Sequence, residues 1–283
     1  MRRPITWLDV FTAIPLTGNG LAVVHDADGL DDATMLAFAR ETRLSETAFV
    51  QTPTADGADY RNRIFTMAGE IAFAGHPSLG TGVAVARQRG ERSASYVQQT
   101  GAGLQPVGVE LDGDPGRATM LQEPPTFGAT APAGEVMPVA GLFGADADPR
   151  FTPQLVSTGL AHVIAPVRDE ALARAAPRAG GLRALLEPLG AIVLYLAAID
   201  VDARRARARG FFLDHMGVIE DPATGSAAGP LLAYLHERAG VDELMIHQGE
   251  AIGRPSVIEC RWEDDRPRVA GDVVVVAEGH VSL

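Results

Sequence analysis

The chain lacks several features that mark whole classes of protein. It has one cysteine, Cys260, so no intrachain disulfide can form and a small disulfide-rich scaffold is excluded. Acidic residues outnumber basic ones by 36 to 24, which leaves no basic surplus for binding nucleic acid or an anionic membrane. No stretch approaches the roughly 20 apolar residues of a membrane span, and the first residues lack the apolar run of a signal peptide. We therefore expect a cytoplasmic protein with neither nucleic acid nor a membrane among its partners.

The signatures of common cofactor sites and nucleophiles are also missing. The sequence has no GxGxxG after a strand, no GxxxxGK[ST] and no GxSxG, which argues against dinucleotide, P-loop and serine-hydrolase chemistry. His215, His236 and His247 do not have the close spacing of a metal site. Cys260 lies in a strand-like pattern, VIECRW, that is typical of an inert core thiol. We expect no metal and no cofactor.

The chain has an ordinary globular composition. Its 283 residues are 46% hydrophobic and 21% charged, enough apolar surface for one large domain or two smaller ones. One helix is expected from a capping Asp31 or Asp32 to Arg40, a second over 77–89 with Gly90 as its stop, and a third from Pro222 to about 238 with Gly240 as its stop. Strands are expected at 5–11, 21–24, 47–52, 61–66, 107–111, 118–122, 155–167, 191–199, 256–262 and 273–277. Many short strands with few long helices predict an α+β protein.

An internal sequence repeat predicts a duplicated lobe. Residues 75–82 read GHPSLGTG and residues 220–227 read EDPATGSA, an offset of 221 − 76 = 145 residues, about half the chain. A segment rich in Pro, Ala and Gly at 124–144 is typical of a linker or a lobe boundary. We expect an N-terminal lobe over 1–126, completed by a C-terminal strand near 270–283, and a C-terminal lobe over 127–269.

Both copies of the repeat are expected to begin a helix. The first turn of a helix leaves backbone N–H groups without partners and carries partial positive charge. Two such ends facing one cleft would hold a carboxylate and stabilise an enolate or carbanion. Gly80 and Gly225 let a ligand or another backbone approach closely. Gly75 and Gly225 are the expected substrate-binding positions, through the backbone N–H groups of Gly75-His76 and Gly225-Ser226. The alternative is that both segments are well-made helix starts packed on a sheet.

Four side chains are candidates for acid–base chemistry. Glu46 stands at the start of an apolar strand in RLSETAFVQT, where a carboxylate beside a cleft is useful, although a solvated loop glutamate or a cap is the alternative. His76 can orient a substrate or exchange a proton, or simply bond to the backbone. Asp221 can be a helix N-cap, and Ser226 can bond back to a helix carbonyl.

These segments, in their order, resemble one known family. LDVFTAIPLTGNGLAVV, LSETAFV, RIFTMAGEIAFAGHPSLGTGVAVA, EDPATGSAAGPLLAYL and QGEAIGRPS are similar to segments of the phenazine-biosynthesis PhzF family and span nearly the whole chain. The resemblance implies the diaminopimelate-epimerase-like fold, in which two similar lobes each curl a sheet around a central helix. It also implies an active site between the lobes and a homodimer.

The resemblance further implies an isomerase or epimerase with a glutamate as general acid/base. The residues carried over are Glu46, His76, Asp221 and Ser226, with Ser45 added as a substrate-binding position. The cysteine pair of the two-thiol epimerases has no counterpart, because Cys260 is alone. The expected substrate is a small molecule that bears a carboxylate. A catalytically inactive binding or scaffold protein of the same fold is the main alternative, and a metal-dependent lyase or hydrolase using His76 and Asp221 is a third.

Overall fold

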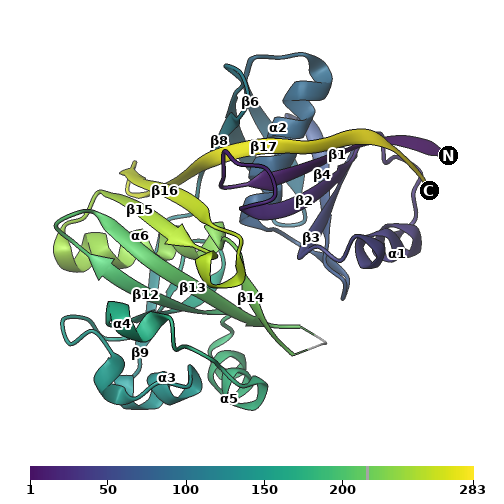
Figure 1. Ribbon diagram of the computed structural model, residues 1–283. Coiled ribbons are helices and arrows are strands. Elements are labelled where there is room, and N and C mark those ends of the chain that lie inside the picture. Colours follow the sequence, from purple (N-terminus) through teal and green to yellow (C-terminus); the bar gives the residue numbers. More distant parts are fainter. Residues whose placement is uncertain (215–216) are drawn as a thin grey trace. The chain divides into compact units, whose positions relative to one another are not determined.

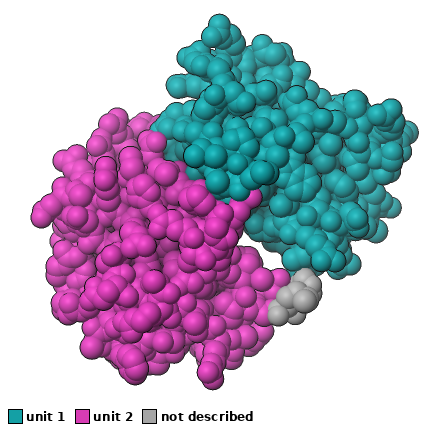
Figure 2. Space-filling view, in the orientation of Figure 1, with its two compact units in different colours: residues 1–121, 270–283 teal, residues 122–269 magenta. Residues whose placement is uncertain are grey.

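The computed structural model describes residues 1–214 and 217–283. The chain forms two compact units, which Figure 2 shows in separate colours. Unit 1 consists of Met1–Leu121 with Ala270–Leu283, and unit 2 of Gln122–Val269.

Unit 1 is a sheet with one long helix at its centre (Figure 1). Its elements are β1 (Arg2–Val10), β2 (Asn19–Val24), α1 (Asp32–Thr42), β3 (Glu46–Gln51), β4 (Tyr60–Phe65), β5 (Glu70–Ile71), α2 (Gly75–Arg89), β6 (Ser93–Thr100), β7 (Gly103–Glu110) and β8 (Gly116–Leu121). The last strand, β17 (Arg266–Ser282), runs from unit 2 into unit 1. Asp31 caps α1 as expected, because its carboxylate accepts a hydrogen bond from the N–H of Thr34.

The sheet of unit 1 closes on itself. Its neighbours are β1–β2 antiparallel, β2–β3 parallel, β3–β4 antiparallel, β4–β6 parallel, β6–β7 antiparallel and β7–β8 antiparallel. Strand β17 pairs with both β8 and β1, so the sheet has no free edge at that seam.

In the described part of the chain, unit 2 contains more helices than unit 1. They are β9 (Thr126–Thr130), α3 (Ala133–Val139), η1 (Gly144–Asp146), β10 (Gln154–Ser157), β11 (Ala161–Pro166), α4 (Asp169–Leu172), α5 (Ala179–Leu186), η2 (Glu187–Leu189), β12 (Val193–Asp200), β13 (Arg205–Leu213), β14 (Val218–Asp221), α6 (Gly225–Ala239), β15 (Glu243–Gln248), η3 (Glu250–Ile252) and β16 (Ser256–Glu263). The prediction of a linker at 124–144 is wrong, because this segment forms β9 and α3.

Unit 2 repeats the topology of unit 1. Its neighbours are β10–β11 antiparallel, β11–β12 parallel, β12–β13 antiparallel, β13–β15 parallel and β15–β16 antiparallel. The same order of strand directions runs from β1 to β7 in unit 1, and α6 takes the place of α2. The predicted α+β class with two similar lobes is therefore confirmed.

The two central helices are buried along most of their length. Residues Gly75 to Ala86 of α2 are all buried, and ten residues of α6 are buried. A helix that is apolar or small on every side is typical of a helix buried in a protein core. At Gly80 of α2 a Cβ atom would lie 2.6 Å from Leu21 Cδ2, so glycine is what lets α2 reach the strands. Gly90 and Gly240 end the two helices in the left-handed conformation, as predicted.

The structure corrects the predicted helix starts. Helix α2 begins at Gly75 rather than Pro77, and α6 begins at Gly225 rather than Pro222. The equivalent starts are therefore 225 − 75 = 150 residues apart, and the alignment of the two prolines at 145 is wrong. In the corrected register His76 and Ser226 are the second residues of their helices. Asp221 instead ends β14, before the helix.

Candidate active-site residues

Glu46 stands where the sequence predicted, at the first residue of β3. Its strand lies parallel to β2, with Glu46 beside Leu21, and the next three residues of β3 are buried. The Glu46 side chain is 18% exposed. The apolar strand thus holds a carboxylate at its end, largely withdrawn from water.

His76 lies next to Glu46 although 30 residues separate them in sequence. The imidazole Nε2 is 3.6 Å from Glu46 Oε2, and His76 is only 5% exposed. The ring bonds to the backbone of Gly20. Because that bond favours the protonated ring and Nε2 has no hydrogen-bond partner, we assign it to an Nδ1–H donor and the Gly20 carbonyl oxygen.

The charge state of the His76 ring follows from its burial. Burial lowers the pKa of His76 to about 3, against the opposing effect of the Gly20 bond, so the ring is neutral at physiological pH. A neutral ring with its proton on Nδ1 turns the Nε2 lone pair towards Glu46 Oε2. The two atoms lie 3.6 Å apart, slightly farther than a hydrogen bond reaches.

The substrate-binding candidates of unit 1 flank this pair. Ser45 donates its hydroxyl hydrogen to Asn19 Oδ1 at 3.2 Å. The N–H groups of Gly75 and His76 open α2, and within the described residues neither has a hydrogen-bond acceptor. These N–H groups give the start of α2 two free donors and the positive end of a helix.

Asp221 is held in place before the start of α6. The hydroxyl of Thr224 donates to Asp221 Oδ2 at 2.7 Å, and Asp221 is 9% exposed. The N-cap residue is Thr224, so the interpretation of Asp221 as the N-cap is wrong.

Gln248, which sequence reasoning missed, orders this turn. Its Nε2 donates to the Asp221 carbonyl at 2.8 Å and to Thr224 Oγ1 at 2.9 Å, and its Oε1 accepts from Thr224 N–H and from the Tyr195 hydroxyl. Gln248 is 1% exposed. It opens the QGEAIGRPS segment, so a polar residue ending an alternating strand was the available signal.

Ser226 bonds to a histidine that the sequence did not single out. His162 Nε2 lies 3.1 Å from Ser226 Oγ, and His162 is fully buried in β11. The predicted bond from Ser226 to a helix carbonyl is not the one present. A histidine inside the apolar run LAHVIAPV was the only sign of it.

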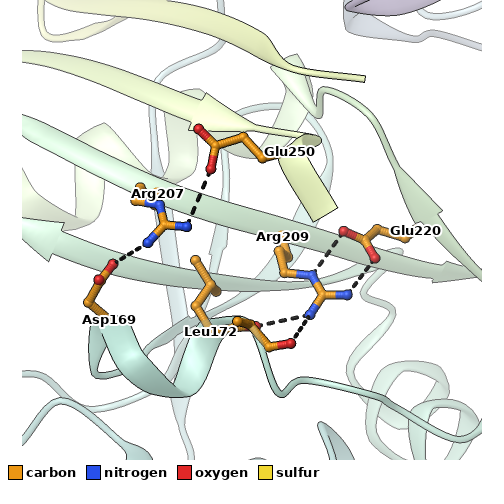
Figure 3. Close-up of polar contacts among 7 residues, drawn as sticks. Asp169, Leu172, Arg207, Arg209, Glu220 and Glu250 are labelled. Atoms are coloured by element: carbon orange, nitrogen blue, oxygen red, sulfur yellow. Dashed lines mark hydrogen bonds and ion pairs between the residues drawn. The ribbon is translucent and has the colours of Figure 1, made fainter. Parts of the chain in front are cut away.

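A buried ion pair fixes the hairpin that carries Asp221. Arg209 of β13 makes two bonds to Glu220, at 2.9 and 2.6 Å, and donates to the carbonyl of Leu172 (Figure 3). It also donates to the carbonyl of Ala175. The two side chains are 13% and 11% exposed. Bidentate geometry of this kind is directional, so it holds β14 and the adjacent Asp221 in register with β13.

The single cysteine and two further histidines considered from the sequence have other surroundings. Cys260 is buried, and burial raises the pKa of its thiol. His236 bonds to Asp242 and stacks on Trp262, and His247 lines a charged pocket of about 750 Å³ in unit 2 with Arg150, Arg207 and Glu250. His215 lies outside the described residues.

In residues 1–214 and 217–283, no three His, Cys, Asp or Glu side chains gather in a way that could hold a metal ion. None of the helices there is long and apolar enough to span a membrane.

Solved structures of other proteins share this fold. A predicted epimerase from Pseudomonas aeruginosa superimposes with a TM-score of 0.88 at 37% identity, covering 99% of both chains. A PhzF-family phenazine biosynthesis protein from Bacillus anthracis gives 0.86 at 28% identity over the full length of both. A hydroxyproline epimerase from Agrobacterium vitis gives 0.68 at 14% identity, covering 99% of this chain and 91% of the other, which shows the fold alone. The chain thus has the two-lobed fold of the epimerases.

The amino-acid sequence is also similar to that of one family of proteins within this fold. The family model described as phenazine biosynthesis-like protein matches residues 8–279. The trans-2,3-dihydro-3-hydroxyanthranilate isomerase of Pseudomonas aeruginosa is 35% identical over 286 residues, with 98% of each chain covered. An uncharacterized isomerase of Escherichia coli is 31% identical over 293 residues, with 98% and 97% covered. The chain belongs to the PhzF family of isomerases.

Proposed function

We propose that the chain is a cofactor-independent isomerase or epimerase that moves a proton on a small substrate bearing a carboxylate. Glu46 is the general acid/base. The observation that carries the proposal is the contact of 3.6 Å between Glu46 Oε2 and Nε2 of His76, whose burial keeps the ring neutral. Such a pair can hold a single proton and pass it to or from a substrate carbon.

The chemistry needs one acid/base group and stabilisation of the charge that it creates. Glu46 removes a proton from carbon, the electron pair is delocalised as an enolate or carbanion, and the proton returns at another carbon or at the opposite face. The N–H groups that open α2 in unit 1, and those that open α6 in unit 2, are each donors suited to a carboxylate or to developing negative charge. We propose Asp221 and Ser226 as the residues of unit 2 that orient a substrate.

The substrate class follows from this chemistry and from the relatives. Proton removal requires a carbon acidified by a neighbouring carboxylate or conjugated system, and amino and hydroxy acids meet that need. A relative that is 35% identical is named for trans-2,3-dihydro-3-hydroxyanthranilate, which belongs to this class. We propose that compound, with a set of other cyclic and linear amino and hydroxy acids, as the first substrates to examine.

Incubation in heavy water tests the proposal. The protein is incubated with each candidate, and the recovered compound is examined by NMR for deuterium bound to carbon. Uptake that depends on the protein supports the isomerase, and it should persist after exhaustive dialysis against a chelator. The alternative, an inactive scaffold of the same fold, predicts no uptake from any candidate.

A further inference from the structure

The hydrogen bond between Ser226 and His162 has a fixed direction. His162 Nδ1 lies 2.8 Å from the carbonyl oxygen of Leu160. A carbonyl oxygen only accepts hydrogen bonds, so Nδ1 carries a proton and donates it. The other nitrogen, Nε2, lies 3.1 Å from Ser226 Oγ.

The charge of His162 decides which atom donates to Ser226. Burial lowers the pKa of His162 to about 4, against the opposing bond to Leu160, so the ring is neutral at physiological pH. A neutral ring with its proton on Nδ1 offers only a lone pair at Nε2. The Ser226 hydroxyl therefore donates its single hydrogen to His162 and keeps only lone pairs for any other partner.

The start of α6 thus presents donors and an acceptor at separate places. The N–H groups of Gly225 and Ser226 have no acceptor among the described residues, and they lie at the positive end of the helix. Ser226 Oγ, turned into an acceptor by His162, lies beside them. An anionic carboxylate suits the N–H groups but not an oxygen that has no hydrogen to give.

We propose that His162 is a positioning residue that makes Ser226 a hydrogen-bond acceptor, so that the substrate must present a donor there. That donor is an amino, ammonium or hydroxyl group next to the carboxylate, which lies on the N–H groups of Gly225 and Ser226. The proposal rests on the proposed function, because it requires a carboxylate-bearing substrate at the start of α6. It narrows the substrates to α- or β-amino and hydroxy acids.

The direction of the bond is measured without any ligand. Two-bond ¹H–¹⁵N correlation spectra of protein labelled with ¹⁵N-histidine report which ring nitrogen carries the proton at neutral pH. His162, assigned by the signals missing in His162→Gln, should be the neutral Nδ1–H tautomer, and Ser226→Ala should shift its Nε2 resonance. An Nε2–H tautomer or a charged ring would overturn the proposal.

The consequence for recognition is measured with a matched pair of probes. 2-Aminobenzoate and benzoate share a carboxylate and differ by one amino donor. Calorimetric titration of the wild-type protein should show a preference of roughly 5- to 10-fold for 2-aminobenzoate, the size of one hydrogen bond. Ser226→Ala should remove that preference. No preference in the wild-type protein, including no binding of either probe, contradicts the proposal, and so does an unchanged preference in Ser226→Ala.

Two substitutions of His162 separate positioning from packing. Asparagine can keep the bond to Leu160, because its amide lies where Nδ1 was, but it offers no acceptor to Ser226. Glutamine reaches the place of Nε2 and can accept from Ser226. His162→Asn should lose most of the preference and His162→Gln should retain it; equal losses would reduce His162 to a packing residue and overturn the proposal.

The result is independent of whether proton transfer occurs. If no candidate takes up deuterium from heavy water, the proposed function fails while the tautomer and probe preference still report on Ser226. If deuterium uptake is found but the probe preference is absent, only the role of His162 and Ser226 is wrong.

Discussion

At the residue scale, two buried histidines, His76 and His162, contact Glu46 and Ser226, the side chains on which the proposed chemistry depends. Glu46 and His76 were predicted separately, and the structure brings them to 3.6 Å because the start of β3 lies beside the first turn of α2. His162 and Gln248 were missed. A buried polar residue is visible only through the partners that satisfy it, and those partners lie 64 and 24 residues or more away along the chain.

The two buried histidines should make the protein acid-sensitive. Burial lowers the pKa of His76 to about 3 and of His162 to about 4, against 6.5 in the unfolded chain. Below about pH 6.5 the unfolded chain takes up protons that the folded chain refuses, so the free energy of unfolding falls as the pH falls towards 4. The loss is roughly 2 kcal/mol per histidine at pH 5.

Urea unfolding of matched variants measures this loss. Between pH 7.5 and pH 5 the wild-type protein should lose about 2 kcal/mol more than His162→Gln. His280→Gln removes an exposed histidine and should behave like the wild-type protein. Equal losses in the wild-type protein and His162→Gln would mean that His162 is not held neutral by burial.

At the element scale, the β13–β14 hairpin should depend on one arginine and not on its neighbour. Arg209 and Arg207 lie two residues apart on β13, but the Arg209–Glu220 pair is 13% and 11% exposed whereas Arg207 is 48% exposed (Figure 3). Arg209→Met leaves Glu220 buried without its partner, which should cost about 3 kcal/mol or more. Arg207→Met should change stability by less than about 1 kcal/mol.

Chemical unfolding of the two variants checks this contrast. Near-equal costs would contradict the buried-pair account of the hairpin. The pair Arg209→Met with Glu220→Met should be more stable than Arg209→Met alone, since it leaves no uncompensated charge.

An added methyl group should destabilise the protein in the central helix α2 and stabilise it in the outer helix α5. At Gly80 a Cβ atom would lie 2.6 Å from Leu21 Cδ2 and 2.9 Å from Val10 Cγ2, so Gly80→Ala should cost about 1–3 kcal/mol despite the better helix propensity of alanine. At Gly180 of α5 nothing lies within 4 Å, and Gly180→Ala should gain about 0.5–1 kcal/mol. Thermal unfolding of both variants measures these changes in stability. A stabilising Gly80→Ala would mean that α2 is not closely packed.

Each misprediction from the sequence has a physical reason. Strand β13 was not predicted, because its buried residues before Phe211 are alanine and glycine, which have a low strand propensity. β6 (SASYVQQT) was missed because its buried face includes Gln98 and Thr100. The repeat was aligned on its prolines, but Pro77 lies in the first turn of a helix and Pro222 in the turn before one.

At the scale of the whole molecule, we propose a homodimer, as the resemblance to the family implied. Light scattering at micromolar concentration should give about twice the chain mass of 29.8 kDa. A mass of one chain across that range would remove the claim.

The central claim is that Glu46 carries the proton, and deuterium uptake by Glu46→Gln tests it most directly. The amide keeps the shape of the carboxylate but cannot accept and return a proton, so the variant should fold, and bind the substrate, like the wild-type protein. With a compound that the wild-type protein labels in heavy water, Glu46→Gln should incorporate carbon-bound deuterium at least about 10²-fold more slowly. Uptake near the wild-type rate in a normally folded Glu46→Gln protein would contradict the account and leave His76 as the first candidate for the proton carrier.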